Sequence, residues 1–99
     1  MQTFVLLAVF SESCNNGNLE KVKACVTLGL NVNSVLRNEG LTGLGIAACK
    51  DNIELLEYLL ACPGVDLYKG SGGYTPLMWA CKLGNDKIVR RLSQVSGIK

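Results

Sequence analysis

Apolar residues recur at intervals of three and four along two stretches of the chain, and this spacing predicts amphipathic helices. Such a helix carries one apolar stripe and needs a neighbouring element to bury it. The stripes consist of Leu19, Val22 and Val26 in the first stretch, and of Ile53, Leu56, Leu59 and Leu60 in the second.

The pattern repeats along the chain with a nearly constant offset. Residues 40–48 (GLTGLGIAA) recur 33 residues later as residues 73–81 (GYTPLMWAC), and the same offset relates Leu59 to Leu92 and Gly64 to Gly97. Residues 17–22 align with residues 51–56 at an offset of 34. A fixed period of this length indicates a stack of similar units, in which each unit buries its stripe against the next.

Turn residues divide each unit. Residues 15–17 (NNG), 50–52 (KDN) and 84–86 (GND) separate two helices, and their Asn and Asp side chains can accept from the first amides of the second helix. Residues 33–40 and 66–73 should form turns that project between units. The glycines at 70, 72 and 73 suit a tight turn that needs positive φ.

The segment from Thr75 to Ala80 (TPLMWA) resembles the T-P-L-H-x-A signature of ankyrin repeats, with methionine in place of histidine. The resemblance implies an all-α ankyrin-repeat solenoid of stacked antiparallel helix pairs with projecting β-turn fingers. We expect a single domain over residues 1–99, with repeat one at 1–35, repeat two at 36–68 and repeat three at 69–99.

Repeat two departs from the family pattern. It has Gly43 and Gly45 in its first helix, where each glycine costs about 1 kcal/mol relative to alanine, so we expect this helix to be the softest. The chain has no histidine, so the threonine–histidine hydrogen bond of the family signature is missing throughout.

The composition favours one packed domain, with 48% hydrophobic and 18% charged residues in a chain of 99. A net charge of +2 gives no reason to expect nucleic acid or a membrane as a partner. Lys87, Arg90 and Arg91 are interpreted as a solvated helix face.

Residues 4–10 are apolar, but no basic residue precedes them, so we interpret them as the first helix of repeat one rather than a signal peptide. A cytoplasmic or nuclear location follows as the default.

Five cysteines without a C-x-x-C pair, and without histidine, argue against a zinc site and a secreted disulfide framework. We therefore expect no cofactor and no metal. Cys14 and Cys81 stand at the repeat position of Ala48 and are interpreted as small core residues. Cys49 stands where repeats usually expose a residue, which makes it a candidate reactive thiol.

The sequence motifs give little support for an enzymatic function. The glycines of residues 40–45 lack the preceding strand of a dinucleotide-binding loop, and residues 70–73 lack the ending of a P-loop. Glu54 and Glu57 should face solvent, and no histidine is available to activate a serine or cysteine nucleophile. We expect no catalytic residues, and chemistry at Cys49 is the remaining enzymatic alternative.

The resemblance also implies where a partner protein binds, because ankyrin repeats recognise partners through finger tips and the exposed side of the first helices. Apolar and aromatic residues at these positions favour a binding strip, although contacts between neighbouring repeats could explain any one of them. The candidate partner-binding residues are Asn15, Asn16, Leu36, Asn38, Glu39, Leu41, Lys50, Ser71, Tyr74, Trp79, Lys82 and Leu83.

Repeat three keeps the same apolar pattern as repeat two, although terminal repeats normally carry polar residues on their outer face. This suggests either self-association through repeat three or an N-terminal position in a longer array. The sequence thus predicts a non-catalytic protein-interaction module that binds through its concave surface. The alternative is a structural spacer, or a fragment of a larger protein whose activity lies elsewhere.

Overall fold

The chain forms three helix pairs in the computed structural model, which describes residues 2–36, 41–69 and 74–96. Each pair contains a first and a second helix joined by a short turn. The six helices of the described residues are α1 (Gln2–Asn16), α2 (Leu19–Thr27), α3 (Gly43–Lys50), α4 (Ile53–Leu60), α5 (Pro76–Leu83) and α6 (Asp86–Ser96).

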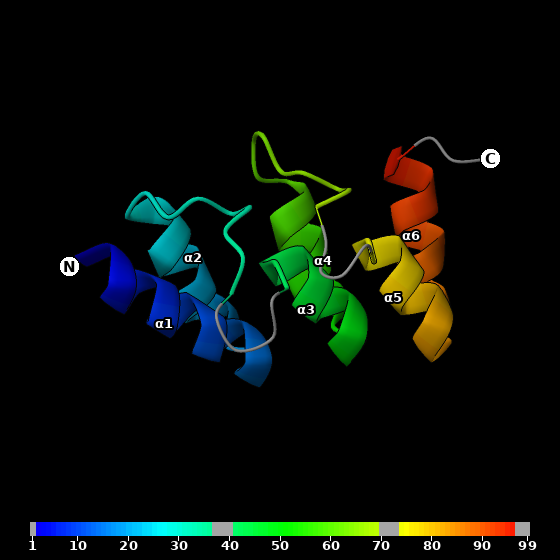
Figure 1. Ribbon diagram of the computed structural model, residues 1–99, viewed down its shortest axis with the longest axis horizontal. Helices are drawn as coiled ribbons and strands as arrows, with labels where there is room; N and C mark the ends of the chain where they lie inside the picture. The colour runs from blue at the N-terminus through cyan, green and yellow to red at the C-terminus, as the bar shows by residue number, and fades with distance from the viewer. Residues whose placement is uncertain (1, 37–40, 70–73, 97–99) are drawn as a thin grey trace.

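The pairs follow one another along the longest axis of a molecule that measures 41 × 24 × 22 Å, with the two termini at opposite ends (Figure 1). Helices α1, α3 and α5 contact each other in sequence, and α4 contacts α6. This arrangement is the all-α stack of helix pairs that the repeat period predicts. The apolar residues 4–10 lie within α1, as expected for the first helix of repeat one.

Short polar side chains begin the helices at the predicted boundaries. Asn18 Oδ1 accepts from the Lys21 amide at 3.3 Å, and Asn52 Oδ1 accepts from the Leu55 amide at 3.1 Å. These bonds satisfy amides that the first turn of a helix leaves without an intrahelical partner. Threonine begins the first helices of repeats two and three. Thr42 Oγ1 accepts from the Gly45 amide at 3.2 Å, so this cap forms without the histidine of the family signature.

The apolar stripes meet in one core that runs through the stack. Val22 on α2 and Leu56 and Leu59 on α4 are fully buried, as the spacing predicts. Leu19, Val26, Ile53 and Leu60 pack against this core while remaining partly accessible to solvent. Each second helix therefore buries one stripe, as its sequence pattern requires.

Gly43 allows repeats one and two to approach closely. A Cβ built at Gly43 would lie 3.1 Å from two ring carbons of Phe10 and 3.3 Å from Leu59 Cδ1. The Phe10 ring is completely buried and occupies the space that a side chain would otherwise take. The glycine that weakens α3 as an isolated helix thus has a packing role between α1 and α3.

Polar contacts connect successive repeats outside the core. The Asn33 side chain donates to Gly64 O at 2.9 Å and accepts from the Asp66 amide at 2.7 Å, which ties the loop after α2 to the loop after α4. The Asn85 amide group donates to Ala48 O at 2.7 Å. Each bond joins one repeat to the next, so together they fix the register of the stack.

Charged residues on the second helices also reach across the repeats. Arg91 Nε donates to Glu57 Oε2 at 2.5 Å, and Lys23 Nζ lies 5.8 Å from the centre of the Tyr58 ring. The expectation that Arg91 and Glu57 only face water was therefore incomplete, because both remain partly exposed but form an ion pair.

The projecting turns are described only at their bases. The Leu36 amide donates to Leu41 O at 2.7 Å and closes the base of the first turn. The predicted finger tips at residues 37–40 and 70–73 lie outside the described residues.

The two glycines of α3 should respond in opposite ways to alanine. We expect Gly45→Ala to raise the free energy of unfolding by up to about 1 kcal/mol, because alanine favours the helix and the nearest atoms to its Cβ lie at 3.4 Å. Gly43→Ala should lower it by about 1–3 kcal/mol through overpacking against Phe10. Urea denaturation measures both changes.

Pairing Gly43→Ala with Phe10→Leu provides the control. The smaller leucine leaves room for the new methyl group, so the double variant should lose less stability than the sum of the two single variants. Additive losses would show that Phe10 does not set the requirement for glycine.

Candidate functional site

An aromatic and basic cluster lies on α5, the first helix of repeat three, and on Tyr74 just before it. The ring centres of Tyr74 and Trp79 are 4.9 Å apart with an angle of 42° between their planes. Lys82 Nζ lies 5.1 Å from the centre of the Tyr74 ring and 5.7 Å from that of Trp79. A lysine within about 6 Å of an aromatic ring is attracted to its electron-rich face. We call Tyr74, Trp79 and Lys82 the α5 cluster.

The surface of α5 is unusually apolar beside this cluster. Tyr74, Met78 and Leu83 expose 38%, 51% and 50% of their surface, and Lys82 is also exposed. The structure thus brings four candidate residues together at α5: Tyr74, Trp79, Lys82 and Leu83. Met78, which the sequence analysis did not select, extends the apolar surface.

Trp79 is half-buried and contributes to both core and surface. Its indole packs against the core, and its Nε1 is shielded from water without an acceptor in the described part of the chain. A buried N–H group without an acceptor costs about 1–3 kcal/mol. The indole is therefore held by its ring contacts and carries an unused donor.

Two candidates for partner contact prove to be core residues. Leu36 is 0% exposed and Leu41 is 8% exposed. Both flank the base of the first projecting turn, where the Leu36 amide donates to Leu41 O, and both belong to the hydrophobic core. Their selection as surface residues was wrong, because the sequence position of a residue beside a turn does not show whether its side chain points into the core or toward solvent.

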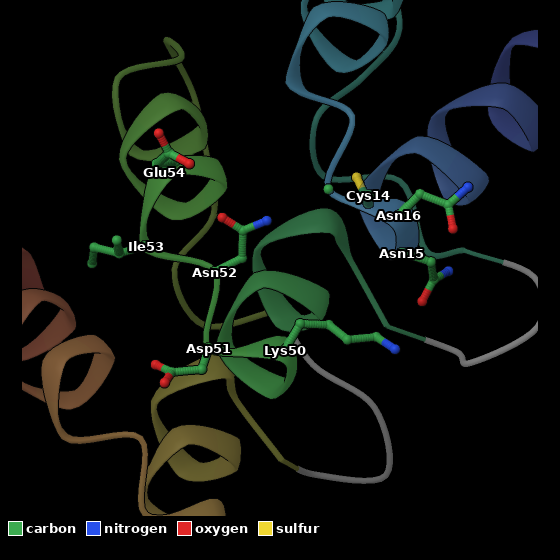
Figure 2. Close-up of a pocket in the computed structure, with 9 residues that line it drawn as sticks. Cys14, Asn15, Asn16, Lys50, Asp51, Asn52, Ile53 and Glu54 are labelled. Carbon is green, nitrogen blue, oxygen red and sulfur yellow. The ribbon is translucent and has the colours of Figure 1, made fainter.

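Three other candidates, Asn15, Asn16 and Lys50, lie together away from the α5 cluster. With six other residues they line an open cavity of about 430 Å³ between the turn after α1 and the turn after α3 (Figure 2). Asn15 is half-buried and its amide donates to Ser11 O at 3.0 Å, whereas Asn16 and Lys50 are exposed. No residue of the α5 cluster lines this cavity. The structure therefore divides the proposed strip into two parts.

Exposed apolar side chains also occur on the loops that follow the second helices. Val35 is 43% exposed and Tyr68 is 59% exposed. The remaining candidates, Asn38, Glu39 and Ser71, lie outside the described residues.

The family model for ankyrin repeats (3 copies) matches residues 9–99 of this chain. The chain belongs to the ankyrin-repeat family. This finding confirms the resemblance drawn from the segment Thr75 to Ala80, and it extends the repeats over nearly the whole chain. Ankyrin repeats generally act as protein-interaction modules, which agrees with a non-enzymatic role.

Known proteins similar to the chain are longer than it. I-Kappa-B like protein H1 of Microplitis demolitor bracovirus is 30% identical over 86 residues, which cover 86% of this chain and 43% of that protein. SMC5-SMC6 complex localization factor protein 1 is 39% identical over 57 residues in both Mus musculus and Homo sapiens, covering 57% of this chain and 5% of those proteins. The chain thus spans less than half of the length of each relative.

The cysteines of these ankyrin repeats have different surroundings. Cys14 is buried as predicted, but Cys81 is exposed, so its interpretation as a core residue was wrong. The reason is that repeat two covers the Cys14 position of repeat one, and repeat three covers Ala48, whereas no described helix pair follows Cys81. All five cysteines are free thiols.

Burial lowers the reactivity of the candidate thiols. Burial raises the pKa of Cys14 to about 12, with a smaller contribution from Cys25. Burial also raises the pKa of Cys49, although the nearby Lys50 opposes the shift. Since the thiolate is the reactive form, Cys49 has a smaller reactive fraction at neutral pH than an ordinary cysteine. These surroundings argue against nucleophilic chemistry at Cys49.

Within residues 2–36, 41–69 and 74–96, no three acidic, histidine or cysteine side chains gather in a way that could hold a metal ion. None of the helices described there is both long and apolar enough to cross a membrane.

Alkylation should distinguish the thiols by burial. We expect iodoacetamide at pH 7.5 to modify Cys81 at least about tenfold faster than Cys14, because Cys81 is exposed and Cys14 is buried with a raised pKa. Cys49 should react more slowly than free cysteine, and its rate should still rise at a pH where free cysteine has reached its plateau. Peptide mass spectrometry measures each rate, and a Cys49 that outpaces free cysteine would contradict this assignment.

Proposed function

We propose that this chain is a non-catalytic module that binds a partner protein, and that the α5 cluster is the centre of the binding surface. The observation that carries this proposal is the contact of the exposed Tyr74 and Lys82 with the half-buried Trp79, beside the exposed Met78 and Leu83. Aromatic residues on a rigid element commonly supply most of the energy of a protein interface.

The contacts within the cluster favour binding by reducing its entropic cost. Tyr74 is held against Trp79, and Lys82 lies over both rings, so three flexible side chains already have restricted freedom before a partner arrives. Ordering a side chain on association costs about 0.5–1.5 kcal/mol, and contacts made in advance avoid part of this cost.

The chemistry of the cluster indicates the kind of partner residue that it accepts. Lys82 supplies an exposed positive charge, and Met78 and Leu83 supply exposed apolar surface on the same helix. The surface therefore suits a partner segment with an apolar side chain next to a carboxylate.

Capture of partners from a cell lysate tests the proposal. We expect the wild-type chain to enrich a set of proteins that the Tyr74→Ala, Lys82→Glu double variant loses by about tenfold or more, because the variant removes both an aromatic anchor and the charge. Quantitative mass spectrometry measures enrichment, and circular dichroism verifies that the variant remains helical. Trp79 is left unchanged because it also packs against the core.

A matched control carries Leu28→Ala and Lys21→Glu on the second-helix side of repeat one. It loses one exposed apolar side chain and reverses one charge, as the test variant does. The control should retain the wild-type set of partners. Equal losses in both variants, or no loss in either, would reject the α5 cluster as the binding centre and favour the structural spacer.

A further inference from the structure

The turns inside successive repeats are joined by a hydrogen bond at one junction but not at the other. Between repeats two and three, the Asn85 side chain donates to Ala48 O at 2.7 Å. Asn52 and Cys14 occupy the same repeat positions between repeats one and two. In the part of the chain that the structure describes, no hydrogen bond links these two residues. The junction between repeats one and two is therefore open at the edge formed by the turns.

The Asn52 side chain uses its oxygen but not its nitrogen. Asn52 Oδ1 accepts from the Leu55 amide at 3.1 Å and caps α4. Its Nδ2 finds no acceptor within residues 2–36, 41–69 and 74–96. Gly17 leaves room for this nitrogen, because a Cβ at Gly17 would lie only 3.2 Å from it. An amide group carries two N–H donors, so Asn52 can donate to a ligand.

This donor borders the cavity of about 430 Å³ between the turn after α1 and the turn after α3 (Figure 2). Ligand pockets in proteins commonly measure about 300–1,000 Å³. Both walls of the cavity belong to neighbouring repeats that the structure describes, so neither end of the chain forms part of it. The cavity is thus a feature of the inner junction between repeats one and two.

The cavity has a basic side and an acidic side. Lys50 Nζ extends from the end of α3 toward the end of α1, and the Asn52 nitrogen faces the same way (Figure 2). In this view the carboxylates of Asp51 and Glu54 lie on the side of Asn52 away from α1. Lys50, Asp51 and Glu54 are exposed, and none of the three forms an ion pair within the described residues. Their charges are therefore available to a ligand.

The donors on the basic side suit a carboxylate. A carboxylate oxygen accepts from an ammonium as well as from an amide N–H, and such charge-assisted bonds are stronger than those between neutral groups. A phosphate would bring additional negative charge close to Asp51 and Glu54, which disfavours it. A basic group beside the carboxylate would instead be attracted to these two residues.

We propose that the cavity between repeats one and two binds a segment of a partner protein in which an acidic residue stands next to a basic residue. The acidic side chain lies between Lys50 and Asn52, and the basic side chain lies toward Asp51 and Glu54. No residue of the α5 cluster lines the cavity, so this site does not depend on the α5 cluster.

A short peptide tests the site in an NMR titration of the 99-residue chain. The probe is acetyl-Arg-Glu-Arg-amide, in which basic residues flank the acid on both sides. We expect the Asn52 side-chain amide signals to shift saturably with a dissociation constant of about 1–10 mM, because exposed charge pairs each contribute little. Acetyl-Arg-Gln-Arg-amide, which lacks the carboxylate, should bind about tenfold or more weakly. Acetyl-Ala-Glu-Ala-amide, which lacks the basic groups, should also bind more weakly.

Substitutions in the chain locate the bound peptide. Lys50→Glu should weaken binding by about tenfold or more, since it replaces a charged donor by a repelling carboxylate. Asn52→Asp should weaken it as well, because aspartate still caps α4 but no longer donates. Lys87→Glu is the matched control, because Lys87 is an exposed lysine on repeat three that does not line the cavity. It should retain binding.

The same substitution at two asparagines tests whether the Asn52 donor is free in the chain itself. Asn85→Asp should lower the urea midpoint, because it loses the bond to Ala48 O. Asn52→Asp should leave the urea midpoint unchanged, because Asn52 Nδ2 has no such bond to lose.

Three results would overturn the proposal. One is the absence of a saturable shift at Asn52, or an equal affinity for the peptide without the carboxylate. Another is a peptide that shifts only signals of Tyr74, Trp79 and Lys82, which would assign it to the α5 cluster. The third is an equal drop of the urea midpoint in Asn52→Asp and Asn85→Asp, which would show that the Asn52 donor is already used within the chain.

Discussion

The structure depends on one packing constraint, which is that no helix pair in this chain can bury its apolar residues alone. Each second helix has a stripe that its own first helix covers only in part, so the next pair must cover the rest. Gly43 shows how tightly this coupling works, because the ring of Phe10 from the preceding repeat occupies the space beside it. Stability and register therefore arise between repeats as much as within them.

The polar contacts follow from the same constraint. Asn33 bridges the loops of repeats one and two, and Asn85 joins repeat three to the carbonyl of Ala48. Because these side chains bind backbone groups of a neighbouring repeat, they specify the offset between units. A chain with the right apolar stripes but without these bonds would stack with a less definite register.

Stacking also decides which residues remain available for partners. Among the described residues, Ala48 packs between two repeats and is fully buried, whereas Cys81 at the same repeat position is exposed. The α5 cluster on repeat three is such a group, because its aromatic and basic side chains contact one another and remain in part accessible to solvent.

The sequence by itself determined the repeat period, the helix boundaries and the family. These features are local: the caps at Asn18 and Asn52 and the stripe containing Leu56 and Leu59 depend on residues only a few positions apart. Only the tertiary structure decided that Leu36 and Leu41 are core residues, that Cys81 is exposed and that Arg91 pairs with Glu57. Those outcomes depend on which neighbouring repeat covers a position, and a residue's place within its own repeat does not contain that information.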